Sequence, residues 1–303
     1  MIDLEQKLLI IGGKGGVGRS SAAAGLAVSM ARRGKKVLAI DSVGAGDLRS
    51  RFSEGSGPVS AGVISSLVAN GVELSILEVS TETSLQEYVQ RFVSLPGGSS
   101  RLMSLGPIAR VFEYVSKAAP AVKEILTVGK IGHEVRNGDW DVVVVDGPAT
   151  GHLVELLSAP ESLFELVQVG PLVEQTAWLN DILADAQQTA VLLVTTPEEL
   201  PVSELVELNS RVENETACGV RAVVVNRMTP VLGDLGVTEA EELIESASSL
   251  APAAQIVLDR SLTTLAQLER VDELGLQRIE VAESSDPMEA FVKAFDRSIS
   301  GGE

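Results

Sequence analysis

Aliphatic runs recur along the chain, and stretches with helical spacing of apolar positions separate most of them. Runs of Val, Ile and Leu without polar alternation are typical of strands buried on both faces, and helices between such strands favour a parallel sheet. The runs predict strands over Lys7–Ile11, Lys36–Ile40, Glu73–Val79, Asp141–Val145, Ala190–Val194, Arg221–Val225, Gln255–Leu258 and Arg278–Val281. We therefore predict an α/β fold with a mostly parallel, twisted sheet of about seven to eight strands and helices on both faces.

Three segments between or after these runs have patterns of their own. Gly44–Gly57 is rich in Gly and Ser and is predicted to be a loop. Residues 82–135 show helical spacing interrupted by Leu95–Ser100, which indicates a small helical insertion within one domain spanning residues 1–303. Asp286–Glu303 places Met, Phe and Val on one helical face, which predicts a terminal helix docked on the core.

The most informative motif is the stretch Gly13–Ser20, which follows the first predicted strand and precedes a helical pattern over Ser21–Met30. A glycine-rich turn between strand and helix lets backbone N–H groups point inward, and the helix N-terminus favours an anion. The spacing fits the phosphate-loop pattern G-x-x-x-x-G-K-[ST], except that Arg19 occupies the lysine position. Nucleotide phosphate binding is therefore predicted at Gly13, Gly15, Gly16, Val17, Gly18, Arg19, Ser20 and Ser21. The Ser20 hydroxyl is predicted to bind Mg²⁺.

Polar residues end three of the predicted strands, at the sheet edge where α/β proteins bind ligands. Asp146 is predicted to hold a magnesium-bound water, and the segment Gly147–His152 after it suits a loop that senses a γ-phosphate. Asp41 lies where phosphate-loop proteins have their first switch. The amide of Asn226 can both donate to and accept from an adenine edge. For each residue a simpler role stays open, namely capping the next helix or supporting a turn.

The composition of the chain argues against some classes of partner and of metal site. The net charge of −18 repels nucleic acid and anionic lipid, so we expect neither as a direct partner. No apolar run approaches the ~20 residues of a membrane span, and the N-terminus lacks a signal-peptide pattern, so we expect a cytoplasmic protein without direct membrane insertion. Cys218 is expected to be an inert small hydrophobe. With one cysteine and two distant histidines, His133 and His152, we expect no dedicated metal site and assign His152 to packing or loop support.

These motifs, in this order, resemble the ArsA-type ATPases, a branch of the phosphate-loop NTPases with a deviant Walker A motif, which includes the Get-pathway ATPases. Lys14 matches the signature lysine early in the loop, and Asp146–Leu153 is similar to the second switch of the family. Ala119–Leu126 and Thr195–Glu199 look like further family segments, and Asn226 matches the adenine-contacting asparagine. The resemblance covers most of the chain.

The resemblance implies ATP or ADP with Mg²⁺ as ligands and catalytic roles for Lys14, Asp41 and Asp146. It also implies a homodimer, or a heterodimer with an ArsA-type ATPase, in which Lys14 reaches the partner's phosphates. Two departures predict impaired hydrolysis: Arg19, and Val43 at the position of the family's water-orienting aspartate. Asp47 could substitute for that aspartate if the loop folds back.

Two alternatives remain beside an active ATPase. The chain could be a catalytically inactive subunit that pairs with an active ArsA-type ATPase. The apolar residues within 86–117 could instead hold a hydrophobic protein cargo, or simply pack on the sheet or on a dimer mate. The chain lacks the Cys-x-x-Cys pair that binds an intersubunit zinc in the Get-pathway ATPase. It also lacks the cysteine cluster that senses metalloid in the arsenite-pump ATPase of the same family, which disfavours a metalloid-pump role.

Overall fold

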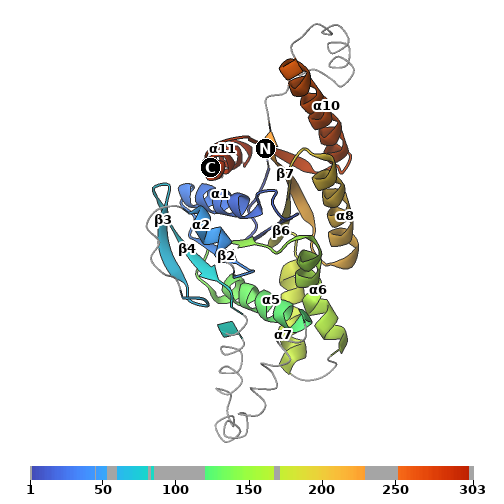
Figure 1. Cartoon of the computed structure of the whole chain (residues 1–303). Helices are drawn as coiled ribbons and strands as arrows, with labels where there is room; N and C mark the ends of the chain where they lie inside the picture. Colours follow the sequence, from blue (N-terminus) through green and yellow to red (C-terminus); the bar gives the residue numbers. More distant parts are fainter. Residues whose placement is uncertain are drawn as a thin grey trace, which may run out of the picture.

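A single eight-stranded sheet forms the centre of the molecule in the computed structural model (Figure 1), which describes residues 2–44, 46–52, 60–80, 83–84, 120–166, 171–228 and 252–299. Its strands lie in the order β3-β4-β2-β5-β1-β6-β7-β8. Their bounds are β1 (Leu8–Gly13), β2 (Val37–Asp41), β3 (Ser65–Ala69), β4 (Val72–Glu78), β5 (Val142–Asp146), β6 (Thr189–Thr195), β7 (Val220–Met228) and β8 (Gln277–Ala282). All neighbouring strands are parallel except β3 and β4. The predicted α/β fold is confirmed.

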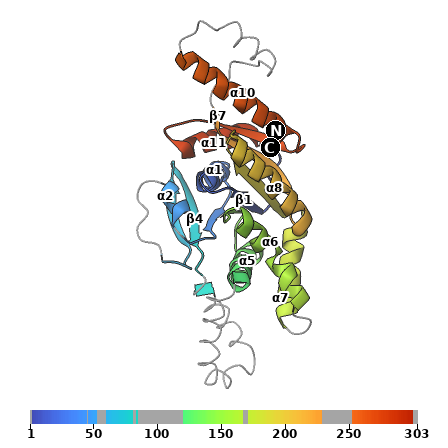
Figure 2. The same cartoon turned by 45° about the vertical axis from the view of Figure 1, so that its right-hand side comes forward.

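Helices cover both faces of this sheet (Figures 1 and 2). One layer consists of α1 (Arg19–Arg32), α2 (Asp47–Arg51) and α11 (Pro287–Ser298). The other consists of α5 (Pro120–Asn137), α6 (Thr150–Leu166), α7 (Pro171–Ala184), α8 (Glu199–Glu215) and α10 (Pro252–Asp272). Alternate residues of β1 serve the two layers: Leu9 and Ile11 pack toward the first, and Leu8 and Ile10 toward the second. This division explains the uniformly apolar strands, because both faces are buried.

Two secondary-structure predictions are wrong. Gln255–Leu258 lies inside α10 rather than in a strand, and Ile256 is 68% exposed. Four apolar residues cannot distinguish a strand from a helix turn, and Pro252 favours a helix start. Conversely, β3 has no apolar run, because an edge strand buries only alternate residues; it joins β4 through a turn at Asn70 and Gly71, both with positive φ.

The structures of the segments 44–57 and 82–135 agree with their predictions only in part. The predicted loop Gly44–Gly57 contains the short helix α2, and residues 53–57 lie outside the described part of the chain. Of the predicted insertion 82–135, α5 supplies a helix from Pro120 onward. Residues 85–119, and with them the apolar segment considered as a cargo site, also lie outside the described ranges.

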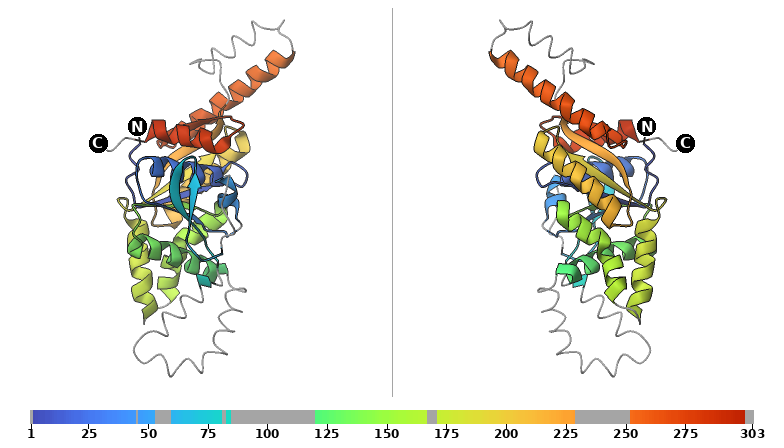
Figure 3. Two further views of the ribbon diagram at one scale, coloured as in Figure 1. Left: turned by 90° about the vertical axis from the view of Figure 1, so that its left-hand side faces the viewer. Right: turned by 90° about the vertical axis from the view of Figure 1, so that its right-hand side faces the viewer.

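The terminal helix α11 is present and packs on α1. Asp286 caps this helix by accepting a hydrogen bond from the N–H of Glu289. Two residues of the helix, Phe291 and Phe295, are fully buried in the core. The backbone of Ile2 pairs with that of Ile299, so the described ends of the chain lie together, whereas the N-terminal end of α10 projects away from the sheet (Figure 3). Within the described residues, no helix has both the length and the apolar character needed to cross a bilayer.

The contact between α1 and α11 predicts a strong effect at Gly25. A Cβ at this position would overlap the Cβ of Phe291 and lie 3.1 Å from the backbone nitrogen of Val292. Gly25→Ala should therefore lower the free energy of unfolding by about 1–3 kcal/mol, as overpacking does. Gly129→Ala in α5 is the control, since its Cβ would meet open space and should stabilise the helix by roughly 0.5–1 kcal/mol. Urea denaturation measures both; equal effects would contradict the packing of α11 on α1.

Candidate functional site

The phosphate loop connects the buried strand β1 to α1 in a conformation that requires glycine. Gly18 precedes α1 with φ of 104°, and a Cβ there would lie 2.5 Å from Nδ2 of Asn226. Gly13 has φ of 142° and its Cβ would overlap the carbonyl of Val194 in the neighbouring strand β6. Gly18 has no side chain to cap α1, and the first turn of this helix carries no acidic residue. The N-terminus of α1 is therefore suited to an external anion.

A cavity of about 440 Å³ opens at this helix N-terminus. Its volume lies in the range of ordinary ligand pockets. Several of the predicted binding residues line it together, while residues from α2, from the end of β7 and from the segment between β8 and α11 complete the wall. The lining residues are Gly16, Gly18, Arg19, Ser20, Ser21, Asp47, Arg51, Asn226, Arg227, Ala282, Glu283, Ser284 and Pro287.

The Arg19 side chain connects the phosphate loop to the segment after β5. Its Nη1 donates a hydrogen bond to the carbonyl oxygen of Gly147, and its buried Nε has no acceptor within the described ranges. Arg19 thus lines the cavity, and its guanidinium is bound to the predicted second switch. A guanidinium is larger and planar, whereas a lysine ammonium is a compact point charge, so the two do not present their donors to a phosphate in the same way.

Asp146 ends β5 beside both β1 and β2 and receives a hydrogen bond from Ser20. The residue is only 5% exposed, and its Oδ1 has no hydrogen-bond partner among the residues that the structure describes. Burial raises the pKa of Asp146 from 3.8 to about 6; the Ser20 hydrogen bond and the charge of Arg19 oppose this shift, and Asp41 and Asp47 add to it. A buried, unpaired carboxylate oxygen beside a hydroxyl fits the pair of groups predicted for Mg²⁺.

This raised pKa predicts a pH dependence of stability in the absence of ligand. Between its ordinary value of 3.8 and about 6, native Asp146 retains a proton that the unfolded chain releases, so its contribution to stability falls as pH rises through this window. The free energy of unfolding of the wild type, relative to Asp146→Asn, should fall by roughly 2 kcal/mol between pH 4 and pH 7. Urea denaturation of both proteins across this range measures it, and a difference that is constant or rises with pH would contradict the burial of the ionised group.

The carboxylate of Asp41 accepts hydrogen bonds from the backbone of the loop that follows β2. Its Oδ1 accepts hydrogen bonds from the N–H groups of Val43 at 3.1 Å and Gly44 at 2.8 Å, and its Oδ2 accepts one from Gly46 at 3.0 Å. Asp41 is 1% exposed. These bonds correspond to the simpler of the two roles considered for Asp41, that of holding the turn at the strand end.

Val43 and Asp47, which follow Asp41 in the chain, differ in their surroundings. The side chain of Val43 is 47% exposed, so no packing requirement explains an apolar residue there. Asp47, the first residue of α2, lines the cavity. Asp47 is thus an acidic residue of this segment that borders the cavity, whereas Val43 is not among the lining residues.

Lys14 lies outside the set of residues that line the cavity. Its Nζ forms an ion pair at 2.5 Å with Oε1 of Glu204 on α8, and both side chains are partly exposed. The amide of Asn226 also makes hydrogen bonds: Nδ2 donates to the carbonyl of Val17, and Oδ1 accepts from the N–H of Arg227. Asn226 therefore supports the phosphate loop, and its amide has one further N–H and one further lone pair that can serve a contact with adenine.

The structure also shows the burial of His152 and Cys218, whose roles were only expected from the sequence. Of the two roles expected for His152, packing is wrong, because its side chain is 69% exposed and hydrogen-bonded to Glu155, while support of the loop stays a prediction. Cys218 is buried, and burial raises the pKa of its thiol to about 12, which agrees with an inert small hydrophobe. Arg51 and Arg227 also line the cavity and were not predicted from the sequence. Their positive charge near the ends of α2 and β7 was the only sign in the sequence that they could face an anion.

The parallel sheet, the glycine-rich turn before α1 and the cavity at its N-terminus define a phosphate-loop NTPase domain. A family model described as anion-transporting ATPase (ArsA) matches residues 6–175. The chain belongs to this ArsA-type ATPase family.

Individual relatives agree with this assignment. ATPase BagA of Mycobacterium tuberculosis is 30% identical over 231 residues, which cover 74% of this chain and 66% of the relative, slightly less than two thirds of its length. ATPase GET3B of Arabidopsis thaliana is 24% identical over 272 residues, covering 75% of this chain and 65% of the relative. A putative arsenical pump-driving ATPase 2 of Aquifex aeolicus is 24% identical over 256 residues, covering 74% and 81%.

Proposed function

We propose that this chain binds ATP or ADP with Mg²⁺ in the cavity at the N-terminus of α1. The observation that carries the proposal is the meeting of an uncapped helix N-terminus with the Ser20–Asp146 pair. The phosphates would lie on the loop Gly13–Ser20 and Ser21, and Ser20 and Asp146 would hold Mg²⁺. Mg²⁺ would supply positive charge to the phosphates, while Arg19 and the helix N-terminus neutralise the remainder.

Thermal unfolding tests this proposal. A ligand that binds only the native state raises the melting temperature. ATP·Mg²⁺ at millimolar concentration should raise the melting temperature of the wild type by several degrees, whereas Ser20→Ala should show a much smaller shift. Ser203→Ala, which removes a hydroxyl of α8 that bonds to Glu199 and Arg270 and does not line the cavity, is the control and should show the same nucleotide-dependent shift as the wild type. No shift in the wild type would contradict the proposal.

We further propose that nucleotide binding drives closure of a dimer, in which Lys14 leaves Glu204 and reaches the phosphates of the partner. The ion pair with Glu204 supports this, because a partly exposed pair contributes at most about 1 kcal/mol and is easily exchanged for a phosphate contact. A lysine that arrives only on closure would stabilise charge on the transferring phosphoryl group. The catalytic assignments of Lys14, Asp41 and Asp146 remain predictions.

Glu204→Gln is expected to favour the dimer, because it removes the charge that holds Lys14 within its own chain. With ATP·Mg²⁺ present, the dissociation constant of the dimer should fall several-fold, since about 1 kcal/mol corresponds to roughly a fivefold change. Light scattering over a concentration series measures the dimer fraction. Glu207→Gln, one turn further along α8, is the control. A weaker dimer in Glu204→Gln than in the wild type would contradict the role of this ion pair.

Hydrolysis by this chain is proposed to be slow. Val43 cannot orient water, and Arg19 is bound to the carbonyl of Gly147 instead of presenting a compact ammonium. The residue types at Val43 and Arg19 support a second proposal, that the chain is a non-hydrolysing subunit of a heterodimer with an active ArsA-type ATPase. Co-purification with such a homologue, followed by light scattering, tests the pairing; persistent monomers in the presence of ATP·Mg²⁺ would contradict it. A hydrophobic protein cargo and a cytoplasmic location remain predictions.

A further inference from the structure

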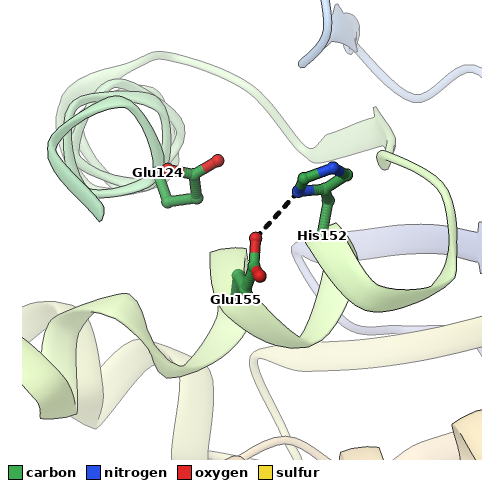
Figure 4. A group of neighbouring side chains, drawn as sticks. All are labelled: Glu124, His152 and Glu155. Carbon is green, nitrogen blue, oxygen red and sulfur yellow. Dashed lines mark hydrogen bonds and ion pairs between the residues drawn. The ribbon is translucent and has the colours of Figure 1, made fainter. Parts of the chain in front are cut away.

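Two helices bring three potential metal ligands together outside the nucleotide cavity. Glu124 comes from α5, and His152 and Glu155 come from the first turns of α6 (Figure 4). One ligand atom from each residue lies within 4.8 Å of the other two, and Nδ1 of His152 lies 2.8 Å from Oε2 of Glu155. His152 and Glu155 are three positions apart on a helix, so they share a face. The three donors can therefore converge on one ion after small side-chain rotations.

The carboxylate of Glu124 has a buried oxygen that lacks a hydrogen-bond donor among the described residues. Its Oε2 is shielded from solvent and has no hydrogen-bond partner in the part of the chain that the structure describes. In Figure 4 an oxygen of this carboxylate faces His152 across the space between the two helices. A buried carboxylate oxygen without a donor is energetically costly, and a bound cation would remove that cost. This observation is independent of the convergence of the three ligands.

We propose that Glu124, His152 and Glu155 bind a divalent transition-metal ion of the Zn²⁺ type, with water completing the coordination. One imidazole nitrogen and two carboxylate oxygens form a donor set that suits Zn²⁺. Mg²⁺ prefers oxygen ligands alone in octahedral geometry, so the imidazole disfavours it. The two carboxylates carry two negative charges, which one dication neutralises. The neighbouring cation Arg211 makes its hydrogen bonds to Glu215, and only its charge acts on Glu155.

The site would link α5 to the start of α6, the helix that follows the Asp146 loop. The count of cysteines and histidines alone gave no reason to expect a dedicated metal site. Glu124 and His152 lie 28 positions apart in the sequence, and only the packing of α5 on α6 brings the carboxylate of Glu124 to the imidazole.

Calorimetric titration of nucleotide-free protein with Zn²⁺ tests the proposal, and the visible absorption of bound Co²⁺, compared between the wild type and His152→Gln, reports on the coordination geometry. We expect one site per chain, with affinity reduced at least roughly tenfold in His152→Gln and in Glu124→Gln. His133→Gln, which changes the other histidine of the chain, should bind as the wild type does. Millimolar Mg²⁺ should not displace the ion.

Two results would overturn the assignment. One is equal Zn²⁺ affinity in the wild type and in His152→Gln, which would mean that ions bind unspecifically to an acidic surface. The other is an absence of saturable binding in the wild type. Because His152 is an exposed side chain, its replacement should leave the fold intact, and circular dichroism checks this.

Discussion

Replacing Gly18 with alanine is expected to lower the affinity for ATP·Mg²⁺ by roughly a hundredfold, equivalent to about 3 kcal/mol. Gly18 has φ of 104°, a backbone conformation that L side chains rarely adopt. An added Cβ would also lie 2.5 Å from Nδ2 of Asn226, which holds the carbonyl of Val17. The substitution therefore deforms the loop at the point where α1 presents its N–H groups.

A matched variant separates the loss of the site from general backbone strain. Gly34 also has a positive φ, of 77°, but its Cβ would meet open space at the far end of α1. Gly34→Ala should cost stability, of the order of 1 kcal/mol, and leave nucleotide affinity unchanged. Calorimetry at a temperature where both variants are folded measures the comparison. An equal loss of affinity in both, or none in Gly18→Ala, would contradict the assignment of the loop.

The double variant Val43→Asp with Arg19→Lys is expected to release phosphate from ATP faster than the wild type, by roughly two orders of magnitude or more. Val43→Asp restores a carboxylate at the position of the family's water-orienting aspartate. The side chain of Val43 is exposed, so the change should cost little stability. Arg19→Lys removes the guanidinium from Gly147 and supplies a compact charge for the phosphates.

Steady-state phosphate release by the two single variants and the double variant measures this gain. Val68→Asp is the control: Val68 is also an exposed valine, but it lies on the edge strand β3 and should not change the rate. If the wild type hydrolyses ATP well and Val43→Asp changes nothing, the interpretation of Val43 is wrong. Loss of that activity in Asp47→Asn would then assign the water to Asp47, which lines the cavity.

Most of the sheet could be predicted because its strands are buried on both faces. The strands β1, β2, β5, β6 and β7 lie between helices, so each carries the aliphatic run that the sequence displays. The edge strand β3 could not be recognised in this way, since only alternate residues are buried. The apolar residues near the start of α10 illustrate the opposite error, a short run without a buried strand.

The site was predictable only where its residues are neighbours in the sequence. The strand, glycine turn and helix of the phosphate loop are contiguous, and the conformations of Gly13 and Gly18 agree with that motif. The contacts of Arg19 with Gly147 and of Lys14 with Glu204 join residues 128 and 190 positions apart. They depend on the packing of loops and helices at the sheet edge, which no local pattern encodes.

A calorimetric titration of the wild-type chain with ATP·Mg²⁺, repeated at two temperatures so that a small heat does not conceal binding, tests the central claim most directly. We predict one nucleotide per chain with a dissociation constant below the millimolar range, and a marked loss of affinity when Mg²⁺ is chelated. An absence of saturable binding at millimolar ATP·Mg²⁺ at both temperatures would contradict the assignment of the cavity at the N-terminus of α1 as a nucleotide site.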